Sequence, residues 1–400
     1  MKKNPIILNC LFFLLSFSLT ARDSGQDISF DFYGSPVKFS ASNSFKEPLS
    51  NPATQSELEA FLKKLSQPGF EACINALMNY KKEQEPDDWL FYQLVRKTAA
   101  SLSPKSENYH RYTAFKYFLM LKSGYDVKLF LKNEKLMFYV QCDENIYNIP
   151  FRIENGKQYV CLNFHDYPNS IPGTETFTGI NLLAAPSVHG FSYKITKLPS
   201  FPATDYVEKE ISFTYYQDDN HFKVKLNPQV RNIFANYPVV DYSNYFNIPL
   251  SNETYQSLIP ALKKQVQGMN HKNGVDYLMR FTRYAFLFET DTKNFGSEKR
   301  LTPEQTLLYD KSDCEDRVAL FFYLVKEVYH LPMIVLSYPQ HITIAVQLEK
   351  PVGRTITYNG SRYSVCEPTP QKEDLAIGQW IPGLQKQPFE IVYAYQPVTR

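Results

Sequence analysis

The order of apolar and polar residues along the chain predicts helices first and strands afterwards in its N-terminal part. Between residues 55 and 125 apolar residues recur at helical spacing in four stretches, separated by breaks rich in proline, glycine or serine. Short runs typical of strands follow at Val127–Leu131, Leu136–Gln141, Ile146–Phe151 and Gln158–Leu162. We therefore expect an α+β unit over residues 22–172.

The C-terminal part repeats this order. Helical patterns begin near Leu250 and Gly274, and a longer one follows Cys314. Strand patterns then follow at Met333–Ser337, Ile342–Leu348, Arg354–Tyr358, Tyr363–Glu367 and Phe389–Tyr395. We expect a second α+β unit over residues 246–400.

The two α+β parts also resemble each other in sequence. Tyr112–Gln141 aligns with Val318–Gln347 with one small gap, and the turn sequences Asn155-Gly156 and Asn359-Gly360 follow at matching places. We interpret the parts as copies of one unit. The first copy has no cysteine near Tyr109, so we expect it to be inert.

Residues 173–245 differ from both copies. They are rich in tyrosine, phenylalanine, valine, threonine and proline, with alternating runs at Phe191–Ile195, Glu210–Tyr216 and His221–Leu226. Asp218-Asp219-Asn220 is expected to form a turn. This pattern predicts a small β-sandwich or antiparallel sheet, so the expected fold class is α+β, with two α+β domains separated by an antiparallel β domain.

The first 21 residues have the pattern of a secretory signal peptide. Lys2 and Lys3 precede an apolar run over residues 5–19, which is shorter than the roughly 20 residues of a spanning helix, and cleavage is expected near Ala21. A lipoprotein reading of Cys10 is less favoured, because the apolar run continues past it. We expect an exported protein, periplasmic or associated with the cell envelope.

Composition limits the partners of the mature chain. Forty-three basic and 41 acidic side chains leave a net charge of +2, and no long block has a single sign. This balance gives no support for nucleic acid or an anionic membrane as a partner. No apolar run after the signal peptide is long enough to span a membrane.

Removal of the signal peptide leaves five cysteines, so at least one is unpaired within the chain. The favoured interpretation of Cys73, Cys142 and Cys161 is that they are small buried hydrophobic residues. A Cys142–Cys161 bridge is the alternative. Cys366 is expected to be buried behind Glu367.

Three residues of the C-terminal part can carry acyl-transfer chemistry. Cys314 lies where a polar turn gives way to an apolar helix, and the free N–H groups and dipole of a helix start favour thiolate. His341 precedes a strand and is a candidate base, and Glu367 ends another strand and can orient an imidazole. Taken singly, His341 and Glu367 are more often surface residues. No histidine has metal-ligand spacing, so we expect no metal and no cofactor.

These residues, with their surroundings, resemble the transglutaminase-like cysteine superfamily, which is related to papain. The residues that carry the resemblance are Thr302-Pro303-Glu304-Gln305-Thr306-Leu307, Asp313-Cys314-Glu315-Asp316-Arg317, His341, Tyr363, Glu367-Pro368-Thr369 and Gly378, within Leu250–Gln396. The resemblance implies Cys314 as nucleophile, His341 as base and Glu367 as the acid. Glu367 departs from the aspartate of many members, and Ser312-Asp313 stands where a small residue is common.

The resemblance implies thiol acyl transfer on peptide or isopeptide amide bonds, with hydrolysis as the simpler outcome. It implies a protein or peptide substrate. The alternative is an inactive binding or scaffold protein of the cell envelope that keeps the fold. The apparent inert copy and the aromatic-rich middle segment favour a binding role for those parts.

Overall fold

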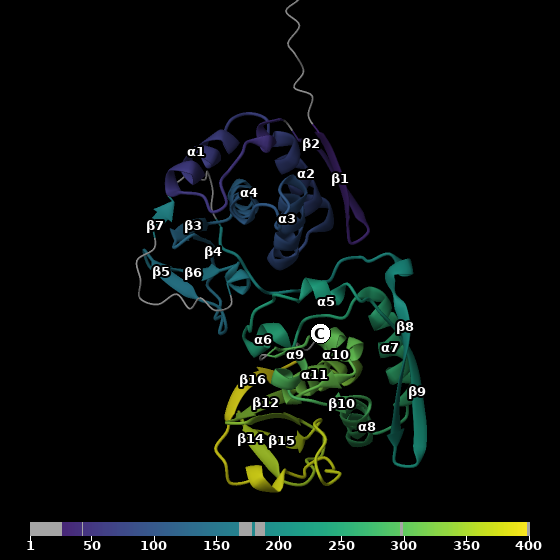
Figure 1. Ribbon diagram of the computed structural model, residues 1–400. Coiled ribbons are helices and arrows are strands. Elements are labelled where there is room, and N and C mark those ends of the chain that lie inside the picture. The colour runs from purple at the N-terminus through teal and green to yellow at the C-terminus, as the bar shows by residue number, and fades with distance from the viewer. Residues whose placement is uncertain (1–25, 42, 168–177, 181–188, 297–298, 398–400) are drawn as a thin grey trace, which may run out of the picture.

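The computed structural model describes residues 26–41, 43–167, 178–180, 189–296 and 299–397 (Figure 1). The predicted signal peptide, residues 1–21, lies outside the described residues. The predicted α+β class is confirmed, because helices pack against two five-stranded antiparallel sheets. Figure 1 shows one sheet in the N-terminal unit and the other in the C-terminal unit.

The N-terminal unit consists of a hairpin, four helices and a sheet, in that order. Thr54 begins the first helix with a capping box, since its side chain accepts from Glu57 N–H and the Glu57 side chain accepts from Thr54 N–H. The elements are β1 (Gln26–Phe32), β2 (Ser35–Ala41), α1 (Gln55–Leu65), α2 (Glu71–Gln84), α3 (Asp88–Leu102), α4 (Tyr109–Lys122), β3 (Val127–Lys132), β4 (Lys135–Gln141), β5 (Phe151–Glu154), β6 (Lys157–Cys161) and β7 (Thr178–Ile180).

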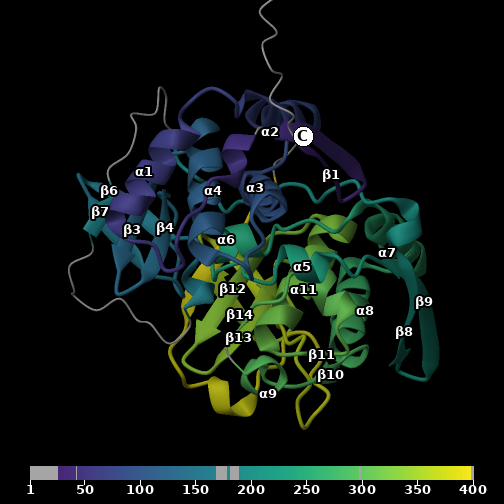
Figure 2. The same cartoon turned by 45° about the horizontal axis from the view of Figure 1, so that its top comes forward.

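Of the two alternatives predicted for the middle segment, a β-sandwich or an antiparallel sheet, its described residues show a two-stranded antiparallel sheet. Its described residues form one hairpin, β8 (Val207–Tyr215) and β9 (Asp218–Leu226), followed by the short helices α5 (Val230–Ile233) and α6 (Tyr242–Tyr245). The apolar face of the hairpin is covered by helices of the C-terminal unit instead of a second sheet. Figures 1 and 2 both show the hairpin alongside these helices.

The C-terminal unit again consists of helices followed by a sheet. Its helices are α7 (Asn252–Gln265), α8 (His271–Tyr284), α9 (Asp291–Phe295), α10 (Pro303–Leu308) and α11 (Cys314–Tyr329). Its strands are β10 (Leu287–Phe288), β11 (Lys311–Ser312), β12 (Met333–Tyr338), β13 (His341–Val346), β14 (Thr355–Tyr358), β15 (Ser361–Cys366) and β16 (Glu390–Tyr395). Short 3₁₀ turns at Asn43–Lys46, Phe164–Asp166, Ala203–Asp205 and Pro382–Leu384 complete the described structure.

The two large sheets have the same topology. Their strand orders are β5-β6-β4-β3-β7 and β14-β15-β13-β12-β16, and every neighbouring pair is antiparallel. The turns at Asn155-Gly156 and Asn359-Gly360 join equivalent strands, and all four of these residues have positive φ, as type I′ hairpin turns require. This match is what duplication of one unit produces.

The strand register identifies the residues of the N-terminal unit that correspond to the three candidate site residues. Val140 pairs with Val160 as Val346 pairs with Ser364, so Lys135 corresponds to His341 and Asn163 to Glu367. Tyr109 begins α4 as Cys314 begins α11. The equivalent positions of the N-terminal unit therefore hold no thiol, imidazole or carboxylate.

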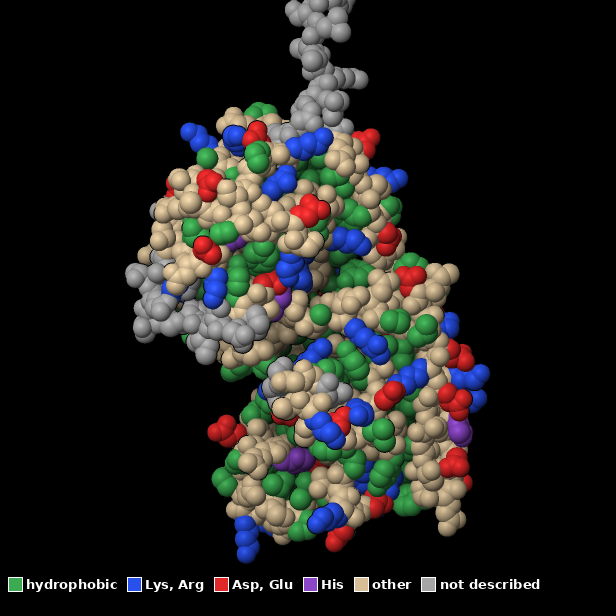
Figure 3. Space-filling view, in the orientation of Figure 1, with side chains coloured by type: hydrophobic (Ala, Val, Ile, Leu, Met, Phe, Trp, Pro, Cys, Tyr) green, Lys and Arg blue, Asp and Glu red, His purple; other side chains and the backbone are tan. Residues whose placement is uncertain are grey.

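One large cluster of buried apolar side chains extends through both units, and each large sheet carries a smaller separate cluster. Trp89 of α3 joins the N-terminal unit to the middle segment, since its indole Nε1 donates to the carbonyl of Ile233 in α5 over 2.9 Å. Cys73, Cys142 and Cys161 are buried and free, as the favoured interpretation predicts, and no Cys142–Cys161 bridge forms. No helix among the described residues is long and apolar enough to cross a membrane. Figure 3 shows basic and acidic side chains interspersed over the visible face.

Lys116, in the middle of α4, is a buried cation whose removal should stabilise the protein. Its ammonium lies 4.5 Å from the centre of the Tyr112 ring, and within the described residues it has no hydrogen-bond or ion-pair partner. Burial lowers the pKa of Lys116 from 10.5 to about 7. The folded state therefore binds fewer protons than the unfolded state between these values, so stability due to this group rises with pH across that window.

We expect Lys116→Met to raise the free energy of unfolding by about 1–3 kcal/mol at pH 7, because methionine fills similar volume without a charge to desolvate. The gain should shrink as the pH approaches 10.5. Urea unfolding at several pH values measures it, with the exposed Lys122 of the same helix, changed to methionine, as control. A lower stability of Lys116→Met at pH 7 would contradict the prediction.

Candidate functional site

Cys314 is the first residue of α11, as predicted. Asp313 caps the helix, because its side chain accepts from Asp316 N–H while the Asp316 side chain accepts from Asp313 N–H. The backbone N–H groups of Cys314 and Glu315 have no partner within the helix, because they lie in its first turn. The helix start thus presents a thiol next to two free donors.

The thiol of Cys314 is held in its protonated form. Its Sγ donates to Oε2 of Glu315 over 2.9 Å. Burial and then the charge of the Glu315 carboxylate raise the pKa of Cys314, and this outweighs the backbone N–H of Ile342, which lowers it. The expectation that the helix start favours thiolate is therefore wrong for this resting arrangement, since a carboxylate one residue away opposes the helix dipole.

His341 and Glu367 lie together. His341 begins β13 opposite Tyr338 of β12, and its Nε2 lies 2.9 Å from Oε2 of Glu367. Oε1 of Glu367 accepts from the N–H of Thr369 over 2.9 Å, and the side chain is only 2% exposed. A carboxylate at Nε2 fixes the proton on that nitrogen and leaves Nδ1 with its lone pair, the form that a base requires.

Cys314 lies next to this pair but is not bonded to it. Helix α11, which begins with Cys314, packs against β13, and the backbone of Ile342 is one of the groups that lower the pKa of Cys314, so the thiol lies near the first residues of β13. Among the hydrogen bonds of the described residues, none joins the sulfur to the His341 ring. The structure therefore pairs His341 with Glu367 and places the thiol beside them, with its proton directed to Glu315.

Two buried arginines support the backbone around the site. Sequence analysis named Arg317 only as part of the resemblance and missed the structural role of both. Arg317, one turn beyond Cys314, donates from Nη1 to the carbonyls of Thr282 and Arg283 and from Nη2 to that of Phe286, each over 2.9 Å. Arg283 in turn donates from Nε and Nη2 to the carbonyl of Glu367 over 3.0 and 2.5 Å. The one sequence signal for such a role is that Arg317 directly precedes the apolar residues of the helix.

Three aspartates gather behind the thiol. Carboxylate oxygens of Asp291, Asp313 and Asp316 lie within 4.8 Å of one another, and all three residues are buried. Each already accepts a backbone N–H: Asp291 from Lys299, Asp313 from Asp316, and Asp316 from Leu301. Burial, and then Asp313, raise the pKa of Asp316, which favours a proton on that group. These contacts give the cluster a structural role at the helix start.

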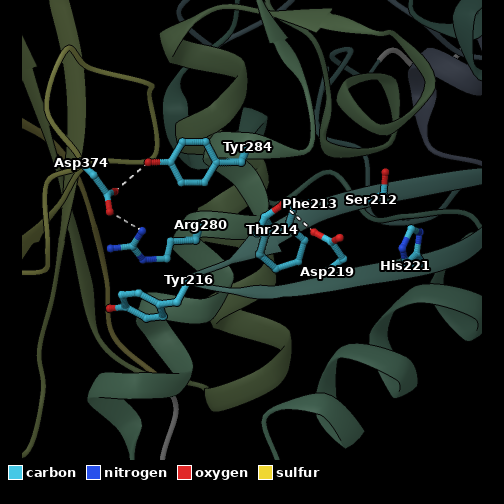
Figure 4. A pocket seen from close by; sticks show the side chains of 9 residues that line it. All are labelled: Ser212, Phe213, Thr214, Tyr216, Asp219, His221, Arg280, Tyr284 and Asp374. Carbon is cyan, nitrogen blue, oxygen red and sulfur yellow. Dashed lines mark hydrogen bonds and ion pairs between the residues drawn. The ribbon is translucent and has the colours of Figure 1, made fainter.

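A polar cavity of about 730 Å³ lies beside the same frame (Figure 4). Its lining residues come from the β8–β9 hairpin, the end of α8 and the segment after β15. They are Ser212, Phe213, Thr214, Tyr216, Asp219, His221, Arg280, Tyr284 and Asp374. Asp374 accepts from Nη1 of Arg283 over 2.7 Å, so one buried side chain links the cavity to Glu367. Sequence analysis missed this cavity, because its walls are distant in the chain.

A thiol, an imidazole oriented by a carboxylate and two helix-start N–H groups are the components that acyl transfer uses. Comparisons with known proteins add no assignment: no family model, no curated protein and no solved structure matches this chain.

Proposed function

We propose that this chain is an exported transglutaminase-like cysteine enzyme that acts by thiol acyl transfer on peptide or isopeptide amide bonds, with hydrolysis as the outcome. The observation that carries the proposal is the His341–Glu367 pair, 2.9 Å apart, beside a thiol at a helix start. Glu367 takes the place of the aspartate that many members of the superfamily have. Its hydrogen bond to Nε2 is the one an orienting acid makes.

The reaction proceeds through a thioester. The thiol turns away from Glu315 and gives its proton to Nδ1 of His341. The thiolate then attacks the amide carbonyl carbon. Backbone N–H groups of Cys314 and Glu315 stabilise the oxyanion. His341 then gives its proton to the leaving amine as the C–N bond breaks. Water, deprotonated by His341, attacks the thioester and releases the carboxylic acid and the free thiol.

His341→Ala is expected to slow alkylation of Cys314 by iodoacetamide at least about tenfold near neutral pH, because the thiol loses the base that takes its proton. The rate is measured across pH by mass spectrometry of the peptide that contains Cys314. The other four mature cysteines are buried and react slowly. His271→Ala at the start of α8, away from the thiol, is the matched control. Equal rates in His341→Ala and the unchanged protein would overturn the catalytic role of His341.

The substrate is identified by comparing cell-envelope fractions treated with the unchanged protein and with Cys314→Ala. New carboxylic acid and amine ends that appear only with the unchanged protein mark the amide bonds it cleaves. The absence of any such product would count against the enzyme.

An inactive binding or scaffold role is the second candidate, and one observation favours it. The Cys314 thiol is bonded to Glu315, and its pKa is raised. An inactive protein predicts ordinary or slow thiol alkylation that His341→Ala leaves unchanged. The alkylation measurement therefore separates the two candidates.

A further inference from the structure

The cavity of Figure 4 is polar, and among the described residues that line it no cation is free. Its one arginine, Arg280, is buried and already bonds two carboxylates, with Nε 3.1 Å from Asp276 and Nη1 2.6 Å from Asp374. No lysine lines the cavity. A phosphate or carboxylate ligand would therefore meet no cation free to bind it.

The remaining lining offers hydroxyl groups, one carboxylate and open aromatic rings. Ser212, Thr214 and His221 project from the outer face of the hairpin, and Asp219 accepts only from Thr214 Oγ1, over 2.8 Å, among the described residues. Apart from Phe213, which also lines the cavity, the apolar side chains of the hairpin point the other way, into the core, so the lining offers little apolar surface to a large aliphatic group. A polyhydroxylated ligand can form hydrogen bonds with these donors and acceptors of the cavity lining.

Tyr216 supplies the open ring. It is 65% exposed, although the Arg280 guanidinium lies 4.5 Å from the ring centre and the Tyr215 ring packs against it with 4.8 Å between the ring centres. Figure 4 shows Tyr216 and Tyr284 on either side of the Arg280–Asp374 pair, at one end of the cavity. Flat, rigid aromatic faces of this kind pack against the C–H face of a sugar ring.

The backbone of Tyr216 is strained, at a position where most of its side chain is exposed. Tyr216 is the first residue of the two-residue turn between β8 and β9 and has φ of +53°. Asparagine, aspartate or glycine is favoured at such a position, and a bulky residue costs on the order of 1 kcal/mol. Its contacts with Arg280 and Tyr215, and the hydrogen bond from its hydroxyl to Oδ2 of Asp276 over 3.3 Å, offset part of this cost, and most of the side chain stays exposed to a ligand.

We propose that this cavity is a saccharide-binding subsite for a neutral glycan, placed beside the thiol site so that the substrate is a peptide joined to a glycan. Arg283 makes the connection, since it bonds Asp374 on the cavity side and the Glu367 carbonyl on the site side. That the saccharide belongs to the substrate rests on the proposed function. The binding itself does not.

Binding is measured on the full mature chain with Cys314→Ala, by saturation-transfer NMR and calorimetry. The probes are the tetramers of glucose and of N-acetylglucosamine, with tetragalacturonate as the charged comparison. We expect at least one neutral tetramer to bind with a Kd in the millimolar range or tighter, and tetragalacturonate to bind at least about tenfold more weakly. Failure of both neutral tetramers to bind, or equal binding of the charged one, would overturn the proposal.

Variants locate the binding. Tyr216→Ala should weaken it about tenfold, Tyr216→Phe should keep most of it because the ring remains, and Asp219→Asn should weaken it several-fold. Tyr147→Ala, at a tyrosine of the N-terminal unit with a similar exposed fraction of 63%, should leave binding unchanged. Equal effects at Tyr216 and Tyr147 would refute the site. Cys314 alkylation is a separate readout, so this proposal and the proposed function can fail independently.

Discussion

Arg317→Met should lower the free energy of unfolding by about 3–5 kcal/mol. The guanidinium is fully buried and satisfies three carbonyls at the C-terminal end of α8, those of Thr282, Arg283 and Phe286. A buried acceptor left without a donor costs about 1–3 kcal/mol, and methionine provides none of the three. Because Arg283 lies on this same stretch, the loss should also loosen the support of Glu367.

Urea unfolding at neutral pH measures this effect. Burial lowers the pKa of Arg317 only to about 10, so the side chain is charged under these conditions. The free energy of unfolding of Arg317→Lys should lie between those of the unchanged protein and Arg317→Met, because an ammonium lacks the planar fork of donors that reaches three carbonyls. Arg362→Met, at an exposed position on β15, is the control and should change stability by no more than about 0.5 kcal/mol. A loss under about 1 kcal/mol in Arg317→Met would show that the three carbonyls find other donors.

The parts of the site that sequence could predict are those set by local patterns. A polar turn that gives way to an apolar run predicts that a helix begins at Cys314, and it does. Alternation along two strands places His341 at the beginning of β13 and Glu367 directly after β15. The short distance between His341 and Glu367 follows from the antiparallel pairing of β13 with β15, which places the beginning of β13 and the end of β15 side by side.

Long-range packing decided the parts that sequence could not predict. The predicted turn at Asp218-Asp219-Asn220 is wrong. The turn is Tyr216-Gln217, and Asp218 to Asn220 belong to β9. The register is set by Phe213 and Phe222, whose rings pack on Phe281 of α8, and no local turn preference records that contact. The arginine frame is hidden for the same reason, because its acceptors are backbone carbonyls that any sequence carries.

Glu315→Gln should shift the alkylation profile of Cys314 to lower pH by at least about one unit. Burial is the largest cause of the raised pKa of Cys314 and remains in the variant, but the carboxylate of Glu315 is the next cause and is removed. Glutamine keeps an oxygen that can accept the S–H bond, so the change isolates the charge. Below the pKa, a shift of one unit raises the thiolate fraction tenfold at a given pH.

The rate of iodoacetamide labelling across pH provides the measurement, and Glu327→Gln, on the same helix but more than three turns away, is the matched control. An unchanged profile in Glu315→Gln would mean that the charge of Glu315 does not hold the proton on the sulfur. The double variant Glu315→Gln with His341→Ala decides what the released thiol does. If His341 accepts the thiol proton, adding His341→Ala should remove part of the gain in labelling rate that Glu315→Gln produces. If the thiol loses its proton without His341, the double variant should keep the whole gain.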